Sequence, residues 1–400
     1  MTAAALDFSV STELRADLRK WRTRAAIVGV IGAVLCLVGL IQSPTQFYRS
    51  YLWSYLFVVG LSVGSLAWLM LQYLTGGAWG VVIRRTCEAA ARTLPLVTLM
   101  FAPILIGIPN LYMWSHANIV ASDGVLQHKH AYLNTPFFLG RAAIFFAGWL
   151  FFAFYFSRWS AAEDIDSRGP AHRKMGAMAG PGLIFWGFSV TFMAIDWVMC
   201  IDPHWSFSSM FGLLFIIGQG LGSMAFLITV MVLLSYRRPM SEVLTSRHLH
   251  DLGKYLLATV MVWAYFSFSQ FLIIWAGNLP KEIPWYIERL RGGWQFVGLA
   301  LVLGHFALPF SLLLSRDLKR NFKLLASIAV FVLLMRFVDL YWLVAPDFTK
   351  GPFSPSWMDL AAPAGIVGLW LAYFLTQLEK RPLMPLHDPD LQEALEHGRE

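Results

Sequence analysis

Long apolar stretches dominate the sequence, and ten of them are long enough to cross a lipid bilayer. A transmembrane helix needs about 20 consecutive apolar residues. The sequence therefore predicts an all-α membrane protein with ten transmembrane helices. The predicted spans lie at 25–43, 51–75, 94–115, 136–158, 180–200, 204–236, 254–277, 293–315, 322–345 and 357–377. The predicted organisation is a tail over residues 1–24, a single transmembrane domain over 25–377 and a second tail over 378–400.

The composition excludes several classes of soluble protein. Charged residues make up 14% of the chain and hydrophobic residues 57%, whereas a soluble domain carries roughly 25% charged residues. A soluble protein of this size cannot bury so much apolar surface. The lipid bilayer is therefore the expected solvent, and a nucleic-acid partner, a secreted disulfide domain and a cytosolic dinucleotide-binding enzyme are excluded. Three scattered cysteines, Cys36, Cys87 and Cys200, are too few for a disulfide framework or an iron–sulfur cluster.

The distribution of basic residues predicts the orientation. With the N-terminus inside, the inner segments hold 23 of the 31 Lys and Arg residues, the outer loops hold six, and Arg141 and Arg336 lie within spans. Inner loops of membrane proteins are enriched in Lys and Arg. Both tails are therefore predicted to be cytoplasmic. The outer side carries the longer polar loop, 116–135, and the segment 278–292, which we expect to lie on the membrane as an amphipathic helix.

Asp196 is the first ionisable residue that stands out within a predicted span. It lies near the outer end of the fifth span, and Asp202 and His204 follow within eight residues. A charged group inside a span costs roughly 2.5–3.5 kcal/mol and is usually paired or functional. A carboxylate and an imidazole in this arrangement can exchange a proton. The alternatives are a buried structural pair for Asp196 and, for Asp202 before Pro203, the cap of the next helix.

Three further ionisable residues lie deep in the eighth and ninth spans. Arg336 and Asp339 are three residues apart and share a helix face, so a buried ion pair and a pair beside a hydrated path are both consistent with the sequence. His305 lies near the middle of the eighth span. A single buried histidine is commonly structural, and haem b would require facing histidine pairs. We therefore expect no haem, no metal site and no catalytic residue in this chain.

Two functional classes remain on these observations. One is a subunit of a membrane redox complex that contains a proton path or a quinone pocket. The other is a proton-coupled secondary transporter. Transporters often have inverted halves with interrupted spans at matching positions. Here the third span contains Pro95, Pro103 and Pro109, whereas the eighth contains only Pro309, near its end. This mismatch favours the redox-complex subunit.

Four segments resemble one known family. They read AIDWVMCIDPHWSFSSMFG, DLGKYLLATVMVWAYFSFSQFLIIWAGNLPKEIPWYIERLRGGW, HFALPFSLLLSRDLKRN and VDLYWLVAP. Together they resemble the ActF subunits of bacterial alternative complex III, which are related to the NrfD and PsrC membrane subunits. The resemblance covers most of residues 25–377. It implies an NrfD-like fold in which spans 2–5 and spans 6–9 form two four-helix bundles, with spans 1 and 10 beside them.

The resemblance also implies a function and a set of partners. The chain would be a subunit of a quinol:cytochrome c oxidoreductase in the bacterial cytoplasmic membrane, as part of a respiratory or photosynthetic chain. Its partners would be a sister NrfD-like subunit, a periplasmic iron–sulfur subunit, multi-haem cytochromes c and, in some systems, a terminal oxidase. Haem c and iron–sulfur clusters would belong to those partners. The resemblance places the better-supported quinol site in the sister subunit and implies a proton path in this chain, with a quinone-facing surface on this chain as an open alternative. A related alternative is an NrfD-type quinol-binding anchor of another iron–sulfur or molybdenum oxidoreductase.

The resemblance places six candidate residues in matching motifs or beside them. Asp196, His305 and Asp339 would line a polar, partly hydrated proton route, and Asp202 and His204 would form its outer mouth. Arg336 would set the proton affinity of Asp339. If quinone binds this chain, the cluster of Asp196, Asp202 and His204 in the outer half of the membrane would be its pocket. Quinol oxidation needs a base near the ring hydroxyls.

Overall fold

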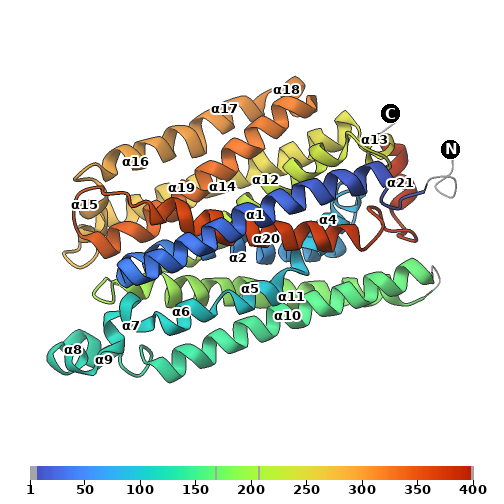
Figure 1. The fold of residues 1–400 in the computed structure, drawn as a ribbon. Helices are drawn as coiled ribbons and strands as arrows, with labels where there is room; N and C mark the ends of the chain where they lie inside the picture. The colour runs from blue at the N-terminus through green and yellow to red at the C-terminus, as the bar shows by residue number, and fades with distance from the viewer. Residues whose placement is uncertain (1–6, 167–168, 206–207, 398–400) are drawn as a thin grey trace.

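The computed structural model describes residues 7–166, 169–205 and 208–397. These residues form helices and connecting turns without any strand, and ten of the helical segments are long and apolar enough to cross a membrane. The predicted all-α class and the number of spans are therefore confirmed. Figure 1 shows the long helices running side by side along one direction of an elongated bundle.

Eight spans are single helices and two are interrupted. The single helices are α1 (Thr12–Gln42), α2 (Pro44–Thr75), α10 (Thr135–Ile165), α11 (Ala171–Trp197), α12 (Ser209–Leu234), α14 (Ser246–Gly277), α19 (Phe322–Thr349) and α20 (Met358–Glu379). The third span consists of α4 (Arg84–Ala91), α5 (Leu94–Leu99) and α6 (Ala102–Ile106) and continues into α7 (Ile108–Leu111). Pro95, Pro103 and Pro109 each occupy one of the first two positions of these pieces, because proline lacks the N–H that a helix interior requires. The eighth span consists of α16 (Trp294–Ala300), the π-helix η4 (Leu301–Ala307) and α17 (Leu308–Leu314).

Short helices connect the spans at the two ends of the bundle. We call the end that carries the chain termini the tail end and the opposite end the loop end (Figure 1). The tail end holds α3 (Ala78–Val81), α13 (Met240–Val243), α18 (Arg316–Arg320) and α21 (Leu391–His397). The loop end holds η2 (Met113–Ser115), α8 (Ala117–Ser122), α9 (Gly124–Lys129), η3 (Met199–Ile201) and α15 (Ile283–Arg289).

Helices α2 and α12 form the centre of the bundle. Helix α2 packs against α4, α11, α12 and α20, and α12 packs against α14 and α19. Helix α19 in turn contacts η4. The expected division of spans 2–9 into two NrfD-like bundles stays a prediction.

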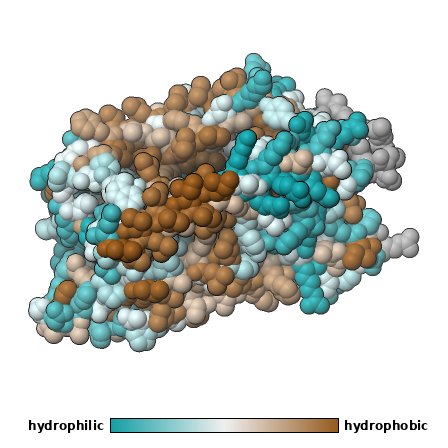
Figure 2. Space-filling view, viewed as in Figure 1, coloured by the Kyte–Doolittle hydropathy of each residue, from teal (hydrophilic) through white to brown (hydrophobic). Residues whose placement is uncertain are grey.

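Glycines bring α1 and α20 into close contact. A Cβ atom on Gly32 would overlap the backbone at Gly365, and one on Gly368 would overlap the backbone at Gly29. Small residues allow transmembrane helices to approach closely and gain van der Waals contact where no hydrophobic effect drives association. The other side of α1 is apolar and exposed, as expected of a lipid-facing helix. Figure 2 shows this apolar surface as a brown band across the middle of the molecule, with a hydrophilic tail end.

Several predicted boundaries differ from the structure. The span was predicted from residue 25, but its helix α1 begins at Thr12, where the side chain of Ser11 caps it by accepting from the backbone N–H of Leu14. The third span begins at Arg84, inside the stretch expected to be an inner loop, and Arg84 and Arg85 are both buried. The C-terminal segment packs back on the bundle, where Leu383 donates a backbone hydrogen bond to Phe8.

Candidate site: a buried polar cluster beside a cavity

A cavity of about 850 Å³ lies between α14, α15, α16, η4 and α19. Helix α14 packs against α17 and α18, whereas the cavity occupies the space between α14 and α16. Its wall is mainly aromatic and aliphatic, with a small number of polar side chains that include Trp263, Asp339, Gln270 and Tyr286. Pockets of roughly 300–1,000 Å³ with apolar walls and a few convergent polar groups are typical of small-molecule sites.

His305 lies on the π-helix η4, behind this wall. Its ring meets the ring of Trp263 edge-on, with the centroids 4.4 Å apart. The side chain is fully buried, and neither ring nitrogen has a hydrogen-bond partner among the described residues. Buried polar atoms normally have a partner, so an unpartnered buried imidazole needs an explanation beyond packing.

The local sequence accounts for the π-helical turn around His305. Pro309 has no N–H to offer to the carbonyl of His305, four residues earlier, so the ordinary α-helical bond is lost there. Single π-helical turns inside α-helices occur frequently at functional sites. The proline that looked unremarkable at the end of the eighth span therefore helps to position its histidine.

Asp339 and Arg336 form a buried ion pair on α19. The Arg336 guanidinium bonds to Oδ2 of Asp339, and the Trp263 indole donates to the same oxygen at 3.2 Å. Among the described residues no other hydrogen bond reaches this carboxylate, so Oδ1 remains free to accept one, and Asp339 lines the cavity. A Cβ atom on Gly218 of α12 would collide with the guanidinium. This glycine therefore makes room for the charge.

The structure thus brings three of the six predicted residues together. Trp263 connects His305 to Asp339, and Arg336 completes the cluster. We call His305, Trp263, Arg336 and Asp339 the cavity cluster. Trp263 was not singled out from the sequence. It lies within a run of aromatic residues in the seventh span, and such a run also suits a lipid-facing or core position.

Asp196 belongs to a different group. Its Oδ2 accepts from Nε of Arg141 at 2.6 Å, and its Oδ1 accepts from the hydroxyl of Tyr132 at 2.8 Å. The Arg141 guanidinium also stacks over the Tyr132 ring. Because both carboxylate oxygens are paired, the buried structural pair that the sequence left open describes Asp196 better than an open proton station does. Arg141, which lies inside a predicted span, was the available signal for this partner.

Asp202 and His204 lie in the turn after η3 and bind neighbouring loops. His204 contacts Asp123 of the long outer loop through Nε2, at 2.5 Å, and Lys350 contacts Asp202 at 3.4 Å. The hydrogen bond with His204 lowers the pKa of Asp123. Asp202 does not cap the next helix, because α12 starts at Ser209 and Ser208 accepts the capping bond. These two residues therefore fasten the loop end together.

Helix α15 closes the cavity at the loop end. Trp285 is buried and stacks on Trp205, with ring centroids 5.0 Å apart. Arg289 is completely buried and donates to Asp347 at 2.9 Å and to the carbonyl of Leu343 at 2.8 Å. The helix is amphipathic as expected, with Ile287 and Leu290 exposed on its other side, and its location on the membrane surface stays a prediction. Burial raises the pKa of Tyr286, on the same helix, to about 12, so that its hydroxyl stays protonated near neutral pH.

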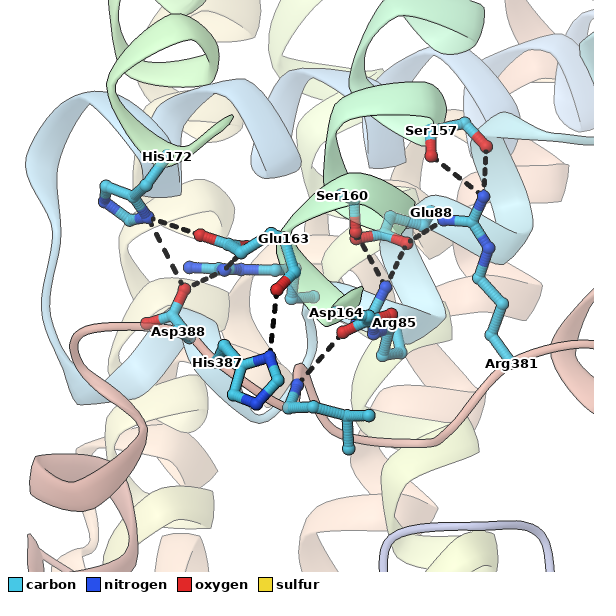
Figure 3. A network of polar contacts seen from close by, with 12 residues as sticks. Arg85, Glu88, Ser157, Ser160, Glu163, Asp164, His172, Arg381, His387 and Asp388 are labelled. Carbon is cyan, nitrogen blue, oxygen red and sulfur yellow. Dashed lines mark hydrogen bonds and ion pairs between the residues drawn. The ribbon is translucent and has the colours of Figure 1, made fainter. Parts of the chain in front are cut away.

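A second buried polar region lies at the tail end, where α4 and α10 meet the C-terminal segment (Figure 3). Arg84 bonds to Asp388 and Glu163, and Arg85 bonds to Ser160 and Asp164. Glu88 accepts from Arg85 at 3.0 Å, from Arg381 at 3.1 Å and from Ser160 at 2.6 Å. We call this the tail-end network. Its acids and bases come from segments far apart in sequence, so residue spacing could not reveal it.

One corner of the tail-end network has the residue types of a metal site. Glu163, His172 and Asp388 each offer one ligand atom, and these atoms lie within 4.8 Å of one another. However, the Arg84 guanidinium already contacts both carboxylates. A cation next to this guanidinium would be repelled, so we interpret the corner as part of the ion-pair network.

Comparisons with known proteins do not add a family to this description. The chain matches no protein-family model and no curated protein sequence. The functional interpretation therefore depends on the geometry above and on the motif resemblance.

Proposed function

We propose that this chain is an integral membrane subunit of a quinol:electron-acceptor oxidoreductase of the alternative complex III type. Electrons would leave through haem c and iron–sulfur centres of partner subunits, namely a periplasmic iron–sulfur protein, multi-haem cytochromes c and a sister membrane subunit. The tails would face the cytoplasm and the loop end the periplasm, in agreement with the distribution of Lys and Arg.

The cavity cluster is the observation that carries this proposal. An imidazole can both accept and release a proton. His305 has two unpartnered ring nitrogens, and its neighbour Trp263 bonds to the carboxylate of Asp339. Groups of this kind in a membrane interior are costly and commonly mark proton relays. In the proposed function Asp339 accepts a proton at the cavity and His305 provides a second proton-accepting group behind Trp263, while Arg336 adjusts the proton affinity of Asp339.

The first experiment is a pull-down of the tagged full-length chain from its native membrane in a mild detergent. A haem-stained gel and a quinol:cytochrome c reductase assay are then carried out on the product. Co-purifying haem-bearing subunits with quinol oxidation support the proposal. A chain that is isolated alone, without haem and without activity towards quinol, contradicts the proposal. Proton-uptake assays in proteoliposomes would then test the transporter alternative.

Variants of the same complex test the proton route. We expect Asp339→Asn to lower quinol oxidation by about tenfold or more, because general acid–base groups typically contribute at least that much. Asp123→Asn at the loop end is the matched control, since it removes one carboxylate that pairs with a histidine outside the cavity. Equal activity of the two variants would contradict a role for Asp339 in proton transfer.

A further inference from the structure

The cavity has a lateral opening through which a lipophilic molecule can enter. Tyr265 and Phe268 on α14 and Leu299 and Val302 on the opposite wall all line the cavity and are more than half exposed. In a membrane these exposed apolar side chains contact lipid. The opening between α14 and α16 therefore connects the cavity with the bilayer interior rather than with water. A molecule that partitions into lipid can reach the cavity without crossing a polar surface.

The polar groups on the cavity wall form two stations. The deep station is Asp339, whose Oδ2 is occupied by Trp263 and Arg336 while Oδ1 can accept a hydrogen bond. The second station is Tyr286, whose oxygen accepts from Gln270 Nε2 at 3.5 Å. Among the described residues the Tyr286 hydroxyl hydrogen has no acceptor, so it can be donated to a ligand. One station therefore accepts a hydrogen bond and the other donates one.

The spacing of the two α14 residues that contact the stations indicates the size of the ligand. Trp263 and Gln270, which contact the two stations, are seven residues apart on α14, a distance of about 10 Å along the helix axis. A six-membered ring with an oxygen at each end, plus a hydrogen bond of about 2.7 Å on each side, has a similar length. Much of the cavity wall is aromatic and includes Phe271, Phe306 and Trp342. A flat ring can stack against such a wall.

We propose that this cavity binds the ring of one isoprenoid quinol between Asp339 and Tyr286, with the tail leaving through the lipid-facing opening between α14 and α16. One ring hydroxyl donates to Oδ1 of Asp339, and the oxygen at the opposite end of the ring accepts from the hydroxyl of Tyr286. The ring's identity as a quinol rests on the proposed function above. The site differs from the outer cluster of Asp196, Asp202 and His204 that the sequence favoured, because those carboxylates are already paired.

The test measures direct binding to the purified full-length chain in lipid nanodiscs. The probe is heptyl-hydroxyquinoline N-oxide, a fluorescent ring with polar substituents and an alkyl tail, and its fluorescence is followed as protein is added. Gly298→Leu fills the cavity, because Gly298 lines it and an added side chain would meet Trp342. Gly187→Leu is the matched control, since a Cβ atom there meets nothing within 4 Å. Tyr286→Phe removes only the donor at the second station.

We expect saturable binding that Gly298→Leu weakens by at least tenfold, that Tyr286→Phe weakens by about three- to tenfold through one lost hydrogen bond, and that Gly187→Leu leaves unchanged. Unchanged binding in Gly298→Leu overturns the site. Weaker binding in Gly298→Leu with unchanged binding in Tyr286→Phe overturns the ring placement, since an alkyl or lipid acyl chain would behave in this way. Tyr286→Phe keeps the ring of the tyrosine, so it tests the proposal even if Gly298→Leu fails to fold.

The failure of this inference differs from the failure of the proposed function. If the chain binds the probe as expected but is purified without haem-bearing partners, the quinol-ring site is supported and the oxidoreductase assignment is contradicted. If the complex oxidises quinol and its Gly298→Leu variant has a normal KM for quinol, the oxidoreductase assignment is supported and the site in this cavity is contradicted.

Discussion

At the tail end, Glu88 is buried among Arg85, Arg92 and Arg381, and Ser160 donates a further hydrogen bond to it. Beside the cavity, Asp339 meets one arginine and one tryptophan, and His305 has no hydrogen-bond partner among the described residues. Both regions place charged groups inside the protein, but Glu88 has a partner at each of its carboxylate oxygens, whereas Oδ1 of Asp339 has none among the described residues. A carboxylate with both oxygens paired holds segments in place, whereas one with a free oxygen can still accept a hydrogen bond or a proton. The free oxygen is therefore a better indicator of function here than buried charge itself.

The largest expected effect comes from breaking the tail-end network. Arg84→Met leaves Asp388 and Glu163 without their shared guanidinium in a buried site, and removing one partner of such a pair costs about 3–5 kcal/mol. Unfolding of the purified protein in detergent measures this loss. Arg238→Met is the control, because its ion pair with Glu242 is exposed and exposed pairs contribute below about 1 kcal/mol. Equal stability of the two variants would show that the network does not hold the tail end together.

The ion pair beside the cavity gives the next largest effect. Arg336→Leu leaves Asp339 as an uncompensated buried carboxylate, so we expect a loss of about 3 kcal/mol, at the lower end of the range for buried pairs. Adding Asp339→Leu should restore most of that stability, because the double variant leaves no charge behind. A double-mutant cycle of unfolding free energies measures the coupling. A double variant less stable than Arg336→Leu would mean that the pair is not the main interaction of either residue.

His305 should separate stability from activity. His305→Leu removes no hydrogen bond made within the described residues, so we expect the free energy of unfolding to change by less than about 1 kcal/mol. Quinol oxidation by the complex should fall by about tenfold or more. His248→Leu is the control, since this equally buried histidine contacts the carbonyl of Ala394 at 2.9 Å and should lose stability instead. An active His305→Leu complex would remove His305 from the proton route.

The smallest effect concerns the loop end. The hydrogen bond with His204 lowers the pKa of Asp123 below its ordinary value of 3.8. Because the pKa is lower in the folded protein, the stabilisation is present above the ordinary value and is lost as the pH falls through the lowered one. Thermal unfolding of wild type and Asp123→Asn should therefore differ slightly at about pH 6 and converge in strong acid. A difference that persists in strong acid would rule out the carboxylate as its source.

The sequence alone determined the class of fold, because a bilayer imposes a strict rule on helix length and polarity. Ten apolar stretches predicted ten spans, and the prolines of the third span predicted its interruption. Arg336 and Asp339 were also paired correctly, since three residues along a helix place two side chains on one face. These features depend on local periodicity, which a single sequence records directly.

Only the tertiary structure decided which buried polar groups are satisfied. Arg141 pairs with Asp196 from another helix, and Arg84 meets Asp388 from the C-terminal segment, 304 residues away. The cavity exists because α14 and α16 leave a space that α15 covers, and no residue pattern along either helix records that space. Packing of distant segments sets the partners of each charge, and it therefore determined that His305 and Asp339, and not Asp196, lie beside an open cavity.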